Sequence, residues 1–254
     1  MIRLVCLDVD GTVSDRFQAP SAPGIVEALA ELRRQYPVRL VTNATSLSHR
    51  ILAEKLAEQQ LLSEPDELIT PAVNARKVLC SRDQASGILL MEQSAREDFE
   101  WFREDPQGRS VVVATEAHDL TIAQLQPAFR LLLDGAAFYT LQQNRYFRRG
   151  EDLVTDLGPV ASFLGYAIGR EVENLGKPSR LLFESLAAEV GCRIDEIVMV
   201  GDDAEFDASG SVALGMRGVL VRTGKYRPGD EGRVEPAPTA VIDSVADLPA
   251  WLGE

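Results

Sequence analysis

Two aspartates stand two residues apart where an apolar, strand-like segment near the start of the chain ends. Residues 4–7 (LVCL) run directly into residues 8–12 (DVDGT). A strand alternates its faces, so the carboxylates of Asp8 and Asp10 would point the same way. Like charges at short range raise each other's pKa, and a hard divalent cation such as Mg2+ relieves that repulsion. The pattern predicts a site for a metal and a phosphate, although calcium loops and plain turns share it.

A hydroxyl and an amide follow the next strand-like run, at residues 38–41. Thr42 and Asn43 can both bind phosphate oxygens, and the N-terminus of the helix expected after them favours an anion. The simpler interpretation is that these two residues only cap that helix.

A lysine precedes another predicted helix, in the sequence Gly176-Lys177-Pro178. Pro178 suits the first position of that helix. Lys177 could neutralise phosphate and carboxylates together, whereas a lysine in such a place is usually solvated.

More carboxylates follow the apolar run at residues 197–200. Asp202 and Asp203 come directly after Gly201, and Asp207 lies four residues beyond Asp203. Such a run is typical of a buried parallel strand, so its end is expected to form a second metal-binding edge. Asp203 has an alternative role as an acid that favours a helix N-terminus.

The composition bounds the class of protein. The 254 residues are 45% hydrophobic, enough for one large domain or two modest ones with real cores. The formal net charge of -13 repels nucleic acids and anionic membranes on average, so neither is expected as a partner. An anionic substrate therefore needs a locally positive pocket.

Cysteine usage and the apolar pattern indicate the compartment. The three cysteines are far apart and form no CxxC pair, which is typical of buried thiols in a reducing compartment. Neither a signal-peptide pattern nor an apolar run of membrane-spanning length is present. We therefore expect a soluble, cytoplasmic protein.

Strands and helices alternate in the N-terminal part of the chain. Apolar residues at helical spacing predict helices over 22–34 and 46–58, and strands are expected at 38–41 and 68–71. The same alternation returns near the C-terminus, with a helix over 178–189, strands at 197–200 and 219–221, and a terminal helix over 244–252.

A middle stretch interrupts this alternation with elements of its own. Strands are expected at 87–91, 110–114 and 138–147, and helices over 121–133 and 160–168. Thr121 and Gln124 resemble a capping box for the first of these helices. We predict an α/β protein with a doubly wound, mainly parallel, Rossmann-like sheet formed by residues 1–76 and 171–254. Residues 77–170 would form an inserted α/β domain, and ligands would gather at the carboxyl ends of the core strands.

Each motif taken alone could have a purely structural role, but the occurrence of all four in this order points more specifically to one family. The chain carries D-x-D-G-T, T-N, G-K-P and G-D-D-x-x-x-D in sequence over nearly its whole length. This set resembles the four motifs of the haloacid dehalogenase-like hydrolase superfamily. An insert between the second and third motifs resembles the class IIA, NagD-like arrangement, in which the insert is a C2-type cap domain.

The resemblance implies a Mg2+-dependent phosphatase that acts on a small phosphorylated molecule. Asp8 would attack phosphorus and become an aspartyl phosphate, while Asp10 would protonate the leaving group and later activate water. The candidate substrates are phosphomonoesters, phosphoamidates and pyrophosphate.

The resemblance also assigns ligands. Mg2+ would be held by the Asp8 side chain, the Asp10 backbone carbonyl and Asp202. Phosphate oxygens would be held by Thr42, Asn43 and Lys177. Asp203 and Asp207 would lie one layer further from the metal and would orient Lys177 or metal-bound water.

Specificity is expected from the insert. Asn144, Arg145, Arg148 and Arg149 form its one dense basic cluster, which could bind an anionic leaving group or simply be a solvated hairpin or a subunit contact. The aromatic-bearing insert and the resemblance suggest a homodimer.

Three alternatives stay open: a phosphotransferase or a dehalogenase with the same aspartyl chemistry, and a phosphate- or metal-binding module without activity. Asp10 argues against the dehalogenase, because a halide leaves without being protonated.

Overall fold

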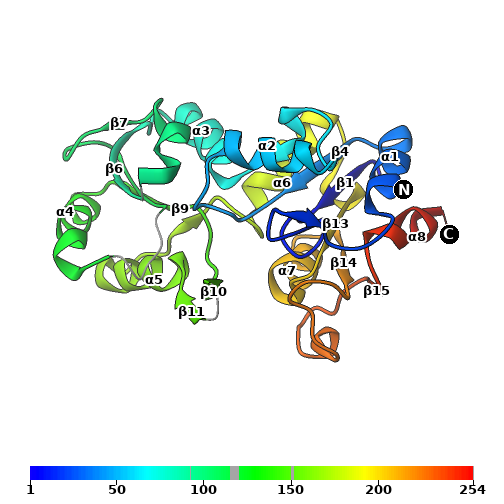
Figure 1. The fold of residues 1–254 in the computed structure, drawn as a ribbon. Coiled ribbons are helices and arrows are strands. Elements are labelled where there is room, and N and C mark those ends of the chain that lie inside the picture. Colours follow the sequence, from blue (N-terminus) through cyan, green and yellow to red (C-terminus); the bar gives the residue numbers. More distant parts are fainter. Residues whose placement is uncertain (92, 115–119, 150–151, 254) are drawn as a thin grey trace. The chain divides into compact units, whose positions relative to one another are not determined.

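The chain forms two compact units, each described here by itself (Figure 1). The computed structural model describes residues 1–91, 93–114, 120–149 and 152–253. The core unit comprises Met1–Thr42, Arg50–Ile69 and Lys177–Glu254, and the insert unit comprises Asn43–His49 and Thr70–Gly176. The assignment of residues 1–76 and 171–254 to a catalytic domain and of 77–170 to a cap stays a proposal.

A six-stranded sheet forms the centre of the core unit, in the order β15-β14-β13-β1-β4-β5 with every neighbouring pair parallel. The strands are β1 (Leu4–Leu7), β4 (Val38–Val41), β5 (Leu68–Ile69), β13 (Ile197–Gly201), β14 (Arg217–Val221) and β15 (Ala240–Ile242). Every residue of β1 and β13 is buried, as expected for central parallel strands that are covered on both faces.

Helices alternate with these strands. They are α1 (Ile25–Gln35), α2 (His49–Glu58), α6 (Arg180–Val190), α7 (Gly210–Ala213) and α8 (Leu248–Gly253). In α6, Leu182, Phe183 and Leu186 pack in one cluster with Leu4 and Met199 of the sheet. Burial of each such side chain contributes roughly 1.5–3 kcal/mol, which fixes the helix on the sheet.

The insert unit has a parallel sheet of its own, in the order β12-β9-β8-β6-β7. Its strands are β6 (Ser86–Leu90), β7 (Arg103–Glu104), β8 (Ser110–Val113), β9 (Ala137–Thr140) and β12 (Glu173–Asn174), and its α-helices are α3 (Pro71–Ser81), α4 (Ile122–Leu133) and α5 (Leu157–Ile168). The predicted capping box of Thr121 and Gln124 begins α4. The prediction of mainly parallel α/β architecture with an inserted α/β region is confirmed.

Three local predictions were wrong. Pro71, expected to close a strand, is the first residue of α3, whose N-cap Thr70 accepts from the Val73 amide at 3.4 Å. Pro178 does not begin a helix, because α6 begins at Arg180.

The third error concerns the expected strand at 138–147, which is divided between β9 and β10 (Tyr146–Arg149). β10 forms an antiparallel hairpin with β11 (Asp152–Thr155). The division follows from the buried polar side chain of Gln142, which donates to Asp156 and accepts from the Asn144 amide, both at 2.5 Å. These bonds replace the strand ladder.

The longest helices among the described residues, α4 and α5, have 12 residues each. A bilayer span needs about 20 apolar residues. In the described part of the chain, no helix has the length and apolarity to cross a membrane.

Candidate active site

The predicted site residues of the core unit follow neighbouring strands of one parallel sheet. Asp8 follows β1, Asp202 follows β13, and Thr42 follows β4. The register pairs Leu7 with both Val200 and Leu40, so the three strands end together. Residues far apart in the sequence are therefore brought to one edge, where open α/β sheets bind ligands.

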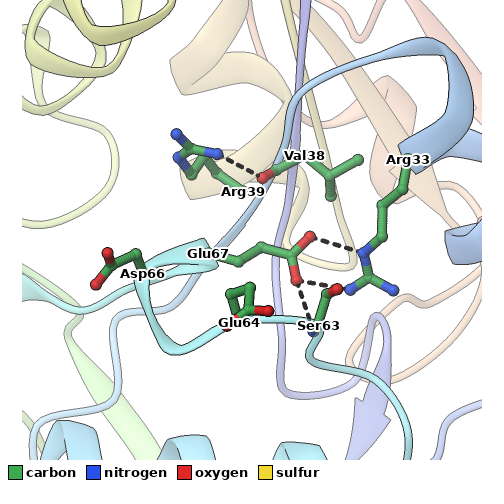
Figure 2. A pocket seen from close by; sticks show the side chains of 7 residues that line it. All are labelled: Arg33, Val38, Arg39, Ser63, Glu64, Asp66 and Glu67. Carbon is green, nitrogen blue, oxygen red and sulfur yellow. Dashed lines mark hydrogen bonds and ion pairs between the residues drawn. The ribbon is translucent and has the colours of Figure 1, made fainter.

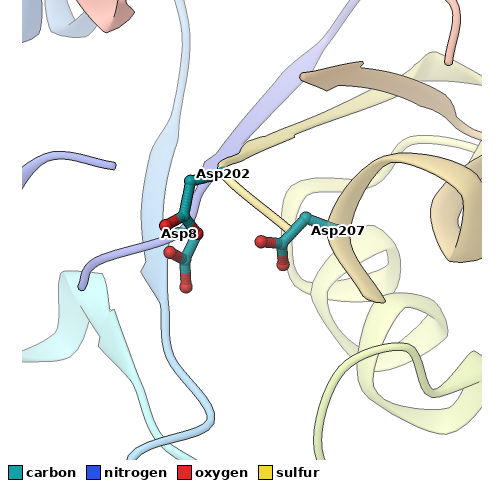
Figure 3. A group of neighbouring side chains, drawn as sticks. All are labelled: Asp8, Asp202 and Asp207. Atoms are coloured by element: carbon teal, nitrogen blue, oxygen red, sulfur yellow. The ribbon is translucent and has the colours of Figure 1, made fainter. Parts of the chain in front are cut away.

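Three buried carboxylates converge there (Figure 3). One oxygen of each of Asp8, Asp202 and Asp207 lies within 4.8 Å of the other two, and the residues are 7%, 2% and 2% exposed. Three negative charges that are this close together and buried from water repel one another strongly, so cations are needed to stabilise the arrangement.

Lys177 supplies one cation. Its side chain is 3% exposed, and its Nζ forms an ion pair with Asp8 Oδ1 and lies 2.8 Å from Asp207 Oδ1. Burial lowers the pKa of Lys177, but attraction from Asp207 and Asp8 outweighs burial and leaves the pKa above its ordinary value. The lysine therefore stays charged, and the alternative that Lys177 is a solvated surface residue is wrong.

One lysine does not neutralise the group. Burial, with repulsion from Asp8, raises the pKa of Asp202 to about 8. Burial raises that of Asp207 to about 7, although its contact with Lys177 opposes the shift. The charge and the amide of Lys225 oppose the shift of Asp202 only in part, so its charged form is incompletely compensated within the described residues.

Asp202 has the donor set that a hard cation would use. Its Oδ2 accepts from the Lys225 amide at 2.6 Å, whereas Oδ1 is buried and has no hydrogen-bond partner among the described residues. A buried, unpartnered carboxylate oxygen beside the Asp8 carboxylate fits Mg2+, which prefers oxygen ligands.

Asp10 lies in the turn that follows β1. In this turn the amides of Thr12 and Val13 donate to the Val9 carbonyl. Asp10 is exposed, and its Oδ1 accepts from the Arg16 amide at 2.8 Å. Crowding by protein atoms and the Asp8 charge raise the pKa of Asp10, against the lowering effect of the Arg16 bond.

Thr12 and Thr42 are buried at the same edge of the core sheet. The Thr12 hydroxyl donates to Asp8 Oδ2 at 3.0 Å, so each oxygen of Asp8 has a partner. The Thr42 amide donates to the Ile69 carbonyl at 3.1 Å, which fixes Thr42 at the end of β4. Asn43 belongs to the insert unit, where its Oδ1 would lie 2.6 Å from a Cβ added at Gly176.

Asp203 takes the capping role. Its Oδ1 accepts from the amides of Glu205 and Phe206 at 3.1 and 3.0 Å, and its Oδ2 lies 3.3 Å from Lys225 Nζ. These contacts begin the π-helical turn Ala204–Ser209, which carries Asp207. The capping interpretation therefore holds, and Asp203 acts on the buried acids through the backbone.

No functional role was predicted for Thr223, Gly224 and Lys225, which follow β14. The Lys225 amide binds Asp202, and Thr223 Oγ1 donates to the Gly11 carbonyl at 2.6 Å. The available signal was topological, because β14 is parallel to β13 and must end at the same edge.

Within the insert unit, two of the predicted specificity residues lie beside a cavity of about 310 Å3. Its lining residues are Gln143, Arg145, Gly158, Pro159 and Ser162. Asn144 adjoins this lining, since its carbonyl accepts from the Gly158 amide at 3.0 Å. Arg148 pairs with Leu153 in the hairpin, and the Arg148 and Arg149 side chains fall outside the described parts.

A second cavity, of about 300 Å3, lies at the amino end of β4 (Figure 2). Arg33 and Glu67 form a bidentate ion pair in it, with Nε–Oε1 and Nη2–Oε2 distances of 2.8 and 2.7 Å. None of the predicted site residues lines this cavity, so the pair has a structural role that ties α1 to the turn before β5.

Family models match both halves of the core. The model described as haloacid dehalogenase-like hydrolase matches residues 5–102, and that described as HAD-hydrolase-like matches residues 174–248.

Similar proteins extend over almost the whole chain. Haloacid dehalogenase-like hydrolase domain-containing protein 2 of Bos taurus is 36% identical over 245 residues, or 96% of this chain and 93% of the relative. Phospholysine phosphohistidine inorganic pyrophosphate phosphatase of Bos taurus is 32% identical over 97% of this chain and 92% of its own. The solved structure of 4-nitrophenylphosphatase from Thermotoga maritima matches with a TM-score of 0.85 and 25% identity, covering 98% and 97% of the two chains.

Proposed function

The chain belongs to the haloacid dehalogenase-like hydrolase family as one of its phosphatases, and we propose that it hydrolyses small phosphorylated substrates with Mg2+ through an aspartyl phosphate on Asp8. One observation carries the proposal: the buried Asp8 carboxylate is held by Lys177 and Thr12 beside Asp202, whose own Oδ1 has no partner among the described residues.

Asp8 is suited to attack phosphorus. The neighbouring Lys177 ammonium forms an ion pair with the Asp8 carboxylate and would attract the phosphate oxygens to the same place. In the first step a bond forms between an Asp8 oxygen and phosphorus while the bond from phosphorus to the leaving oxygen breaks. Lys177, Thr42 and Asn43 are the proposed partners of the three other phosphate oxygens.

Asp10 is suited to move protons. Its raised pKa and exposed position allow it to give a proton to the leaving oxygen. The resulting carboxylate then takes a proton from water as the water oxygen attacks phosphorus, which releases phosphate and restores Asp8.

The residues also fit the metal. Asp8 and Asp202 would hold Mg2+, joined by the Asp10 carbonyl, and the ion would screen the charge between carboxylate and phosphate. Asp207 keeps Lys177 in place at 2.8 Å, and Asp203 fixes the turn that carries Asp207. Both residues would thus orient the groups that contact the metal and the phosphate without contacting either themselves.

Substrate class and assembly extend the proposal. The similar proteins are named for phospholysine, phosphohistidine, pyrophosphate and 4-nitrophenyl phosphate, so phosphomonoesters, phosphoamidates and pyrophosphate are the candidate substrates here. We assign selectivity to the insert as a cap, through Asn144, Arg145 and Arg148. A homodimer and a cytoplasmic location stay predictions.

The test is phosphate release from a panel of these substrates, with Mg2+ and with a chelator. We expect release only with Mg2+, and capture of a phosphorylated Asp8 peptide after rapid quenching. Transfer to a sugar without release would favour a phosphotransferase. The absence of release from every substrate would favour a binding module.

A further inference from the structure

The three residues Thr223–Lys225, here called the TGK loop, follow β14 and turn back over the site. The Tyr226 amide donates to the Thr223 carbonyl at 3.1 Å, which closes a tight turn. The turn aims the Lys225 amide at Asp202 Oδ2, 2.6 Å away. This contact belongs to the backbone, because the Lys225 side chain is 62% exposed and reaches Asp203 instead.

Glycine is required for this approach. Gly224 has φ +58°, and a Cβ there would overlap Asp202 Oδ2 and lie 2.6 Å from Gly11 Cα. Gly11 has φ +86°, and a Cβ there would overlap the same oxygen. Thr223 Oγ1 then ties the TGK loop to the Gly11 carbonyl at 2.6 Å. The TGK loop, the Asp202 carboxylate and the turn after Asp8 are therefore in direct contact.

The packing gives the two oxygens of Asp202 different surroundings. Oδ2 is held by the Lys225 amide and crowded by two glycines, whereas Oδ1 is buried without a partner among the described residues. We propose that the TGK loop is a positioning element that locks the Asp202 carboxylate so that Oδ1 is presented to a divalent cation. The inference rests on the proposed function, because it takes Asp202 as a metal ligand.

Gly224→Ala tests the proposal, with Gly229→Ala as its matched control. Gly229 also has a left-handed backbone, φ +91°, but a Cβ there meets nothing within 4 Å. The control therefore carries the backbone strain of the substitution without the overlap on Asp202. Mg2+ alone is titrated into the full chain by calorimetry, after circular dichroism has shown that each variant is folded, because a partly unfolded population would raise the apparent Kd.

We expect Gly224→Ala to weaken Mg2+ binding roughly 10- to 100-fold, the range found when groups that orient metal ligands are changed. Gly229→Ala should bind Mg2+ as the wild type does. In kinetics, the Mg2+ concentration for half-maximal activity should rise in Gly224→Ala while the KM for substrate at saturating Mg2+ stays near the wild-type value. A defect that leaves some molecules irreversibly misfolded would instead lower the binding stoichiometry and leave Kd unchanged.

Equal Mg2+ affinity in Gly224→Ala and the wild type would overturn the inference and leave the proposed function standing. A wild type that releases phosphate without binding Mg2+ would overturn both the metal site and this inference. If Gly224→Ala does not fold, Thr223→Val replaces it, because it removes only the hydroxyl bond to Gly11. A loss of roughly 2- to 10-fold in Mg2+ affinity would then support the inference, and unchanged affinity would overturn it.

Discussion

The partners of Asp8 decide what that residue can do. Lys177 and Thr12 each hold one of its oxygens, and the side chain is nearly dry. Such a carboxylate is held in one orientation and shielded from water, which suits a nucleophile. Asp10, two residues later, is exposed and has a raised pKa, which suits an acid. The different surroundings of the two aspartates thus suit them to different chemical roles.

Asp8→Asn tests the nucleophile. The amide has nearly the shape of the carboxylate but cannot attack phosphorus, so turnover should fall by roughly a thousandfold or more. The fold should persist, because the substitution removes one charge from a group of three crowded acids. Steady-state phosphate release and thermal unfolding are the measurements, and the exposed Asp66→Asn serves as control. Wild-type turnover by Asp8→Asn would refute the assignment.

Asp10→Asn tests the proton donor. Its loss should matter most where the leaving oxygen is basic, so kcat for an alkyl phosphate should fall about 100-fold or more, and that for 4-nitrophenyl phosphate much less. The ratio of the two losses is measured in one buffer series. Equal losses for both substrates would contradict the acid role.

At the scale of elements, the carboxyl edge of the core sheet concentrates acids. Asp202 has a folded-state pKa of about 8 and Asp207 of about 7, both above the ordinary value near 3.8. Both acids bind protons more tightly in the folded protein. Without metal, their contribution to stability is therefore present below about pH 4 and is lost as the pH rises towards 8.

Magnesium should reverse this loss. At pH 8 the cation neutralises the acids, whereas at pH 5.5 bound protons compete with it, so Mg2+ should raise Tm by several degrees at pH 8 and by much less at pH 5.5. Thermal unfolding with Mg2+ and with a chelator at each pH is the measurement. Asp202→Asn should show little response to Mg2+ at either pH. An equal Mg2+ effect at both pH values in the wild type would argue against the metal site.

Helix α6 carries the packing that holds Lys177 near the sheet, since Lys177 precedes it by three residues. Leu186 is 1% exposed and packs in the cluster with Leu4 and Met199. Leu186→Ala should lower the free energy of unfolding by about 2–5 kcal/mol. The exposed Glu184→Ala, on the same helix, should change it by less than about 0.5 kcal/mol. Denaturant unfolding measures both, and a neutral Leu186→Ala would contradict the packing described.

Across the whole molecule, the sequence predicted what depends on long apolar patterns. The continuous apolar runs of β1 and β13 were recognised as buried strands from the sequence. Their parallel pairing places Asp8 beside Asp202. Prediction from the sequence failed where one residue type suits two different local structures. Pro71 closes strands and opens helices equally well, and only the Thr70 cap decides between them.

The TGK loop escaped prediction for a related reason. Its contact with Asp202 is made by a backbone amide, which every residue except proline has, so residue type carries no signal. The division of residues 138–147 likewise depends on the side-chain bonds of Gln142, which form only in the folded chain.

The net charge of -13 acts over the whole molecule. It repels an anionic substrate at long range, while Lys177 attracts it only at short range. Salt screens the long-range part, since the Debye length is about 10 Å at 0.1 M, so kcat/KM for a dianionic phosphate should rise about twofold or more between low and moderate ionic strength at fixed Mg2+. A phosphate ester whose leaving group carries a positive charge is the control and should show a smaller rise. A steady fall in kcat/KM for the dianion would mean that a positive local field, and not the net charge, governs its approach.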